Sequence, residues 1–366
     1  MLAIDAVGSV TGGSVFRKSR ALVGLDIGSS AVKAVELKTV GKGFRVSAFG
    51  TQAVPPDSIV DGAIIDASAV ADAIRQVFEG NKAFTTKDVC ASLSGNAVIV
   101  KKITLPVMTK SELDESIYWE AEQYIPFEIH DVNLDYQILD PGTGPESRGT
   151  MEVLLVAVKK EKIGDYSGVI ALAGRTPVIV DVDAFALQNA YEVNYGQGSG
   201  EVVVLLNAGA SAINVNILQS DQSVFTRDIP MGGNAYTEAL QKDLDLAFDA
   251  ADELKKGVPV DGATFEEARP VIQAVTESVL LEIQKTFDFF STAPSDQFDR
   301  IVLSGGASRV DGFREMLLER FATPVDEFDP FRAVTWDVKA SDVDPADVGS
   351  SAAVAVGLAL RRVGDR

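Results

Sequence analysis

Residues 25–34 read LDIGSSAVKA and residues 206–215 read LNAGASAINV, so the two stretches match without a gap. The shift between them is 206 − 25 = 181 residues. Further along each half, Leu303-Ser-Gly-Gly matches Leu93-Ser-Gly-Asn. Two matches in the same order predict a duplicated βββαβα unit, and therefore an α/β protein of two similar domains that face each other across a cleft.

Composition narrows the possible functions of the 366-residue chain. Its 33 Lys and Arg against 53 Asp and Glu give a formal charge of −20, which disfavours nucleic acid and anionic lipid as partners. One cysteine, Cys90, and one histidine, His130, exclude disulfides, Cys/His zinc sites and histidine-based triads. No stretch reaches the roughly 20 apolar residues of a membrane helix. Residues 1–20 have the wrong charge order for a signal peptide, so we expect a cytoplasmic protein with a flexible N-terminal arm.

A different pattern interrupts the first half. Thr109-Lys-Ser-Glu112 predicts a capping box that opens a helix as far as Tyr124. Two strands and a second helix, 160–173, follow and complete a small inserted α+β subdomain. The units predicted in chain order are the arm (1–20), a first domain (21–104 with 176–198), the inserted subdomain (105–175), a second domain (199–348, its smaller lobe at about 231–275) and a C-terminal helix that returns to the first domain (349–366).

The repeated stretches carry the candidate chemistry. Each half brings Asp/Asn-x-Gly-x-Ser from a strand into a tight turn, where glycine lets backbone N–H groups approach phosphate oxygens. Asp26 is suited to a hydrated Mg²⁺ and Lys33 to neutralising phosphate charge. One such hairpin alone would more simply be a surface turn, whereas two in register indicate a phosphate site. The candidate ligands are Asp26, Gly28, Ser29, Ser30 and Lys33 in the first loop, and Asn207, Gly209, Ala210 and Ser211 in the second.

Three further features fit the same cleft. Gly232-Gly233-Asn234 precede a predicted helix, whose N-terminus could bind an anion or a ribose. Gly305, Gly306 and Ala307 form a flat backbone surface after a strand, which could accept a base. Asp252 and Lys255 share one helix face. Each has a simpler alternative. Turn geometry alone could require the glycines of the first two features, and Asp252 and Lys255 could form a surface ion pair.

These motifs resemble those of the actin and heat-shock chaperone ATPases: two phosphate loops, an adenosine motif at 303–307 and a ribose-contacting helix at 251–255. Within that superfamily, the inserted subdomain resembles the FtsA and PilM branch. Three segments are most similar to the PilM family of type IV pilus assembly proteins, and the resemblance extends over residues 21–364. These segments are Lys102-Ile-Thr-Leu-Pro-Val, Glu120-Ala-Glu-Gln-Tyr-Ile-Pro-Phe and Leu134-Asp-Tyr-Gln-Ile-Leu.

The resemblance implies an actin-like fold with an ATP–Mg²⁺ site between the halves. It also implies a groove near the insert for the short cytoplasmic N-terminal peptide of PilN, an inner-membrane protein. The protein would then be a scaffold for pilus assembly and twitching motility, held at the membrane by its partners, next to the motor ATPases and able to form a ring or filament. An aromatic cluster either lines that groove or belongs to the insert's own core: Tyr118, Trp119, Tyr124, Ile125, Pro126 and Phe127.

The same resemblance bears on catalysis. Asp183 corresponds to the water-positioning acid of the superfamily, although Asp181 is close and Asp183 could instead be the N-cap of the following helix. Asn207 stands where many relatives have an acid, and Asp252 where a longer Glu is usual. We therefore expect nucleotide binding with weak or absent hydrolysis.

Two alternatives remain from the sequence. One is a small-molecule kinase of the same superfamily, with an aspartate as general base. The other is an FtsA-like filament tethered to the membrane by a C-terminal amphipathic helix, although the tail after Val354 carries few large apolar residues.

Overall fold

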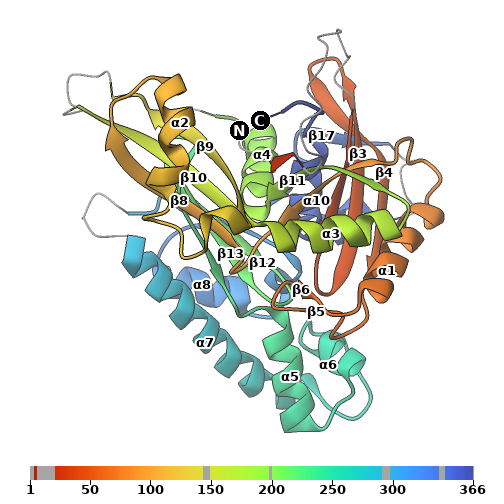
Figure 1. The fold of residues 1–366 in the computed structure, drawn as a ribbon. Coiled ribbons are helices and arrows are strands. Elements are labelled where there is room, and N and C mark those ends of the chain that lie inside the picture. The colour runs from red at the N-terminus through yellow and green to blue at the C-terminus, as the bar shows by residue number, and fades with distance from the viewer. Residues whose placement is uncertain are drawn as a thin grey trace.

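The computed structural model describes residues 4–5, 21–142, 149–197, 200–290, 297–337 and 343–365 (Figure 1). Within these residues, two main sheets, of seven and five strands, form the body of the molecule. In the first sheet, β1 (Ile4–Asp5), β11 (Thr176–Val182), β7 (Asp88–Leu93), β2 (Val23–Ile27), β3 (Ala31–Val40), β4 (Gly43–Ala53) and β17 (Val334–Trp336) lie side by side in that order. The second runs β14 (Gln222–Ile229), β13 (Ile213–Gln219), β12 (Val202–Ala208), β15 (Arg300–Ser304) and β16 (Val325–Glu327).

Removing β1 and β17 leaves two sheets of identical topology, β11-β7-β2-β3-β4 and β16-β15-β12-β13-β14. The registers agree as well. Asp26 pairs with Lys33, and Asn207, which is 181 residues after Asp26, pairs with Asn214, which is 181 residues after Lys33. The predicted duplication is therefore confirmed in topology and in register.

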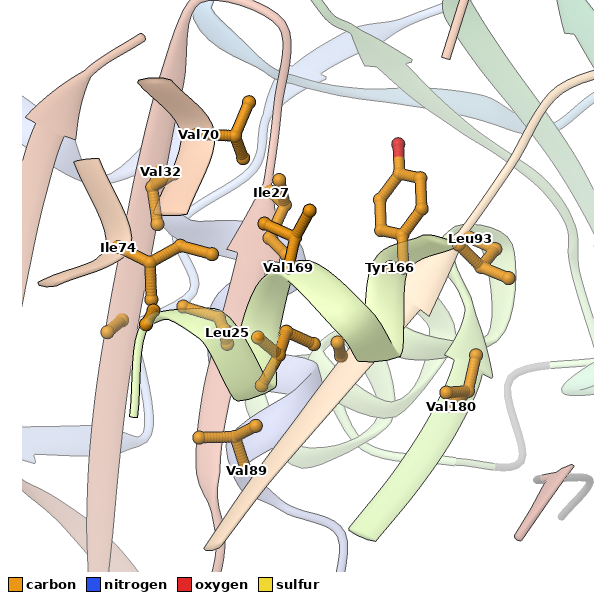
Figure 2. Close-up of a cluster of buried hydrophobic side chains, with 14 of the residues drawn as sticks. Leu25, Ile27, Val32, Val70, Ile74, Val89, Leu93, Tyr166, Val169 and Val180 are labelled. Atoms are coloured by element: carbon orange, nitrogen blue, oxygen red, sulfur yellow. The ribbon is translucent and has the colours of Figure 1, made fainter. Parts of the chain in front are cut away.

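Helices cover both sheets because their apolar faces need burial. In the first half, α1 (Ala67–Gly80) packs on the sheet through Val70 and Ile74, and Asp66 caps its first turn. From the same side, α3 (Lys160–Leu172) adds Tyr166 and Val169 to this core (Figure 2). The second half is covered by α5 (Gly233–Leu244), α6 (Phe248–Leu254), α7 (Phe265–Phe290) and α8 (Phe313–Phe321).

The inserted unit has its own sheet, in the order β8-β10-β9, and its own core. Its elements are β8 (Val98–Pro106), α2 (Lys110–Ala121), β9 (Val132–Asp140) and β10 (Thr150–Lys159). The predicted capping box at Thr109 and Glu112 is present. The helix ends three residues before Tyr124, because the chain turns there and buries Ile125.

Two boundaries predicted for this unit differ from the structure. β8 pairs with β10 along its whole length, so the unit begins at Val98 and not at residue 105. α3 belongs to the core of the first sheet, where it packs beside α1 and β11, so the unit ends with β10. Periodicity could not reveal this, because it identifies strands without identifying their partners. Residues 98–159 are called the insert below.

Three other predicted boundaries also differ. Ile4 and Asp5 pair with β11, so part of the predicted flexible arm forms an edge strand. β17, predicted within the second domain, pairs with β4 of the first sheet. α7 continues to Phe290, so the predicted limit of the smaller lobe at 275 falls inside a helix.

The two halves are joined by packed helices. α4 (Asp183–Tyr195) lies against α10 (Ala353–Ala359), and every residue of α10 is buried. A buried helix is not available to lie on a membrane, which argues against the tether alternative. The remaining short elements are β5 (Ile59–Val60), β6 (Ala63–Ile64) and α9 (Pro345–Val348), with 3₁₀ turns at Ile129–Asp131, Gly306–Arg309 and Ser350–Ala352. Within the described residues, no helix combines the length and the apolar character that crossing a membrane requires.

Candidate functional site

A cavity of about 330 Å³ lies between the two halves, within the size range of small-molecule sites. It brings together all the residues predicted from the sequence except Gly232. They are Asp26, Gly28, Ser29, Ser30, Lys33, Asp183, Asn207, Gly209, Ala210, Ser211, Gly233, Asn234, Asp252, Lys255, Gly305, Gly306 and Ala307. Gly232 instead lies against the second loop, where a Cβ would be 2.5 Å from the Gly209 carbonyl oxygen.

The two predicted phosphate loops form the same turn. The Gly28 N–H donates to the Ala31 carbonyl at 3.1 Å, and the Gly209 N–H donates to the Ala212 carbonyl at 2.9 Å. The loops touch across the cleft, because the Ser29 hydroxyl donates to Ser211 Oγ at 2.8 Å. Two loops with exposed serine hydroxyls and glycine backbones thus face one small space.

Charge distinguishes the two loops. In the first, Lys33 Nζ lies 3.0 Å from the Asp26 carboxylate, and both side chains are mostly buried. In the second, the equivalent pair is two neutral amides, with Asn207 Nδ2 donating to Asn214 Oδ1 at 2.9 Å. The cationic and acidic groups suited to a phosphate and a metal ion are therefore concentrated on the first loop.

In the third glycine motif, the backbone conformation itself requires glycine at position 305. Gly305 has φ +92°, and a Cβ there would lie 2.2 Å from the Ala208 carbonyl oxygen. Only glycine fits at this position, which brings the turn into direct backbone contact with the second phosphate loop.

The Asp252–Lys255 pair is not a surface ion pair. Lys255 is buried, lies 2.5 Å from Asp252, and also donates to the Gly233 carbonyl and to Thr237 Oγ1. Burial lowers the pKa of Lys255. Burial opposes ionisation of Asp252 as well, yet hydrogen bonds from Lys255 and Lys256 outweigh it and hold the pKa of Asp252 below its usual range. Lys255 therefore holds the first turn of α5 in place through Gly233 and Thr237. The helix that ends beside it, α6, lines the cavity through Asp252.

Asp183 is the first residue of α4, and Val182 is the N-cap, so the N-cap alternative is wrong. Burial and, to a smaller extent, the neighbouring Asp26 carboxylate raise the pKa of Asp183 to about 6, against hydrogen bonds from the hydroxyls of Ser92 and Ser94. Asp181 does not line the cavity, since it forms a fully buried ion pair with Arg361 at 2.6 Å. Of the two neighbouring acids, Asp183 is the one in the site.

The sequence analysis missed several residues of the cavity wall. Lys256 directly follows one predicted motif and Arg309 lies two residues after another, so their positions along the chain could have indicated them. Thr51 could have been found from the meander, because it pairs with Lys33 across β3 and β4. Tyr166 and Gly62 come from α3 and the β5–β6 turn, and no sequence signal connected them with the site.

A second cavity of about 380 Å³ lies between the insert, α4 and the β13–β14 turn, and we call it the insert groove. Its walls are β9 and β10, α4, and the turn between β13 and β14. Among the described residues, the buried Nδ2 of Asn189 has no hydrogen-bond partner here. The lining residues are Gln137, Leu139, Leu154, Phe185, Gln188, Asn189, Glu192, Gln197, Ser220, Asp221, Gln222 and Ser223.

The aromatic cluster predicted near the insert divides into two groups, and none of its members lines the insert groove. Ile125 is buried in the insert's core, and Tyr124 and Phe127 pack against that core. Tyr118 and Trp119 on α2 are exposed, Trp119 to 73%, and Pro126 is exposed as well.

A family model described as type IV pilus assembly protein PilM matches residues 24–363. The chain belongs to the PilM family. Among solved structures, it is similar to one described as a PilM-PilN type IV pilus biogenesis complex, with a TM-score of 0.81 and 28% identity over 93% of this chain and 98% of that chain. Both the family and the actin-like fold predicted from the sequence are thereby confirmed.

More distant structures share the fold of PilM proteins. The ethanolamine utilization protein EutJ from Carboxydothermus hydrogenoformans has a TM-score of 0.56 and 15% identity, over 93% of this chain and 89% of that one. MreB5 of Spiroplasma citri, bound to AMPPNP, has a TM-score of 0.53 and 15% identity, over 93% and 95%. At this identity, the similarity extends to the fold alone.

Proposed function

We propose that this protein is a nucleotide-binding scaffold of the type IV pilus machinery, which holds a PilN-like partner by its short cytoplasmic N-terminal peptide. It would work in the cytoplasm, next to the inner membrane and the motor ATPases, with self-association into a ring or filament. Membership of the PilM family supports the cellular role. The observation that carries the biochemical role is the convergence of both phosphate loops on one cavity.

The cavity residues fit ATP–Mg²⁺ by their chemistry. The backbone N–H groups and serines of both loops suit phosphate oxygens, and the turn at Gly305–Ala307 suits the base. Asp26 would hold the magnesium ion through water, and Lys33 would neutralise phosphate charge. The described residues contain no group of three metal-ligating side chains, so bound phosphates and water would complete the coordination shell.

The same residues support slow or absent hydrolysis. Asp183 has a pKa near 6 and could orient a water molecule or accept its proton in the cleft. The second loop, however, offers neutral Asn207 where an acid would help to organise the metal's water shell. A scaffold needs nucleotide occupancy, not fast turnover.

The insert groove is the proposed peptide site. Leu139, Leu154 and Phe185 provide apolar contacts, while glutamines and the unpaired Asn189 amide provide hydrogen-bonding groups. A groove of this composition suits an extended peptide, whose backbone carbonyls can accept from amide donors. A solved relative at 28% identity, described as a PilM-PilN complex, supports PilN as the partner.

A thermal-denaturation series tests nucleotide binding. At about 100 times the dissociation constant, ATP–Mg²⁺ should stabilise the wild type by about 2.7 kcal/mol. Asp26→Ala should abolish the effect, whereas Asp72→Ala, which removes an exposed carboxylate from α1, should retain it. If the wild type shows no shift, the nucleotide site is wrongly assigned.

A further inference from the structure

Strand β14 runs between the two sites. Gln222 and Ser223, at its beginning, line the insert groove. Asp228, near its end, lines neither cavity but is hydrogen-bonded to residues of both halves. One short strand therefore runs from the insert groove to Asp228, which joins the two halves.

A chain of side-chain hydrogen bonds leads from the cleft to Asp228. The Ser304 hydroxyl donates to Asn207 Oδ1 at 3.3 Å, and Asn207 Nδ2 donates to Asn214 Oδ1 at 2.9 Å. Asn214 Nδ2 then donates to Asp228 Oδ1 at 2.7 Å. These three bonds cross β15, β12, β13 and β14 in the order in which the strands lie in the sheet.

The other carboxylate oxygen of Asp228 is hydrogen-bonded to the first half of the molecule. Oδ2 accepts from the backbone N–H of Gly95 at 2.5 Å. Gly95 has φ +83° and accepts from the N–H of Val98, the first residue of β8. Lys159, the last residue of β10, donates to the Ala97 carbonyl, so both ends of the insert meet beside Gly95.

We propose that Asp228 is a positioning residue that couples nucleotide occupancy at the second phosphate loop to the width of the insert groove. This inference rests on the proposed function. The insert, α4 and the β13–β14 turn all line the groove, and β14, which continues from that turn, packs against β8 at the base of the insert, so the width of the groove depends on how β14 sits against the insert. A charged acceptor shared by one donor from each half holds that arrangement.

The coupling has a simple physical origin. Asn207 lines the cleft and directs its amide N–H toward Asn214. A phosphate oxygen competing for that donor weakens the Asn207–Asn214 bond, and the change passes through Asn214 to the Asp228–Gly95 contact. Nucleotide thereby favours one orientation of the insert relative to β14, and a peptide that prefers that orientation binds with a different affinity.

Calorimetric titration of the full-length protein with a PilN-like N-terminal peptide, with and without ATP–Mg²⁺, tests the proposal. In the wild type, we expect the two dissociation constants to differ by at least about fivefold, the lower end of typical couplings. In Asp228→Ala, their ratio should fall to about one, while peptide and nucleotide each still bind. Asp243→Ala removes an exposed carboxylate from α5 and should retain the wild-type ratio.

The outcomes separate the two proposals. If the wild type binds no peptide, the proposed function fails. If it binds both ligands with a ratio of one, or if Asp228→Ala keeps the wild-type ratio, the coupling role of Asp228 is wrong and the proposed function stands. Should Asp228→Ala not fold, Asp228→Asn replaces it. Asparagine can accept only one of the two hydrogen bonds through its carbonyl oxygen, so the ratio should again approach one.

Discussion

Asp181 and Asp183 are two residues apart and have opposite surroundings. The Asp181 side chain forms a buried ion pair with Arg361, while Asp183 faces the cleft beside Asp26. Along a continuous strand, both would point to the same face. They do not, because the strand ends at Val182 and the helix turns the next side chain toward Ser92 and Ser94 at the end of β7.

The raised pKa of Asp183 makes the stability of the protein depend on pH. A carboxyl whose pKa is higher in the folded state than in the unfolded chain contributes stability at low pH, and this contribution is lost as pH rises through the folded pKa. The relevant range extends from about 4, the unfolded value, to about 6. Below it, Asp183→Asn should match the wild type, and above it the variant should be more stable by at most about 3 kcal/mol.

Urea unfolding at several pH values between 4 and 8 measures this difference. The control, Asp243→Asn, removes an exposed carboxylate and should leave the pH profile unchanged. A difference between Asp183→Asn and the wild type that stays constant over the whole range would contradict the assignment of the raised pKa.

At the scale of elements, α10 packs very closely against two elements of the first half, α4 and β2. A Cβ at Gly357 would lie 1.7 Å from the Ala186 carbonyl oxygen of α4, and a Cβ at Gly24 would lie 2.1 Å from the Ala355 carbonyl of α10. Backbone therefore packs directly on backbone on two sides of one short helix. Since backbone atoms cannot rotate away as a side chain can, a methyl group at either position must move whole elements apart.

Gly357→Ala should accordingly destabilise the protein by about 3 kcal/mol, the upper part of the range for overpacking. Gly164→Ala is a matched control, because Gly164 also lies inside a helix but has open space around its Cβ position. That variant should gain up to about 1 kcal/mol from helix propensity. Urea unfolding of the two variants compares them directly, and a Gly357→Ala variant as stable as the wild type would show that α10 packs less closely than described.

At the scale of the whole molecule, the insert groove illustrates a conflict between stability and binding. No single element forms the groove, since the insert, α4 and the β13–β14 turn each supply a wall. Within the described residues, the Asn189 amide is buried there without an acceptor, which costs about 1 to 3 kcal/mol for a group of this kind. Its retention makes sense if a bound peptide supplies the acceptor.

Asn189→Leu should therefore make the free protein about 1 kcal/mol more stable and weaken peptide binding at least about tenfold. Thermal denaturation and calorimetry measure the two effects on the same sample. Gln273→Leu, an exposed change on α7, should alter neither. Unchanged peptide affinity in Asn189→Leu would place the peptide elsewhere on the molecule.

The candidate site was largely predictable from sequence because its central parts are local. The turns at Gly28 and Gly209 and the capping box at Thr109 each close within four residues, so neighbouring residues determine them. Duplication then places two such turns at equivalent ends of equivalent strands. Local hydrogen bonds and steric limits need no knowledge of distant parts of the chain.

Only the tertiary structure decided which distant groups meet. It assigned α3 to the first sheet, separated Asp183 from Asp181, brought Tyr166 to the cleft, and joined Asp228 to Gly95 across 133 positions of sequence. Periodicity records which face of an element is buried, but not which element covers it. The sequence by itself thus determined the repeated loops and the family, whereas the contacts that link the cleft to the insert follow from packing.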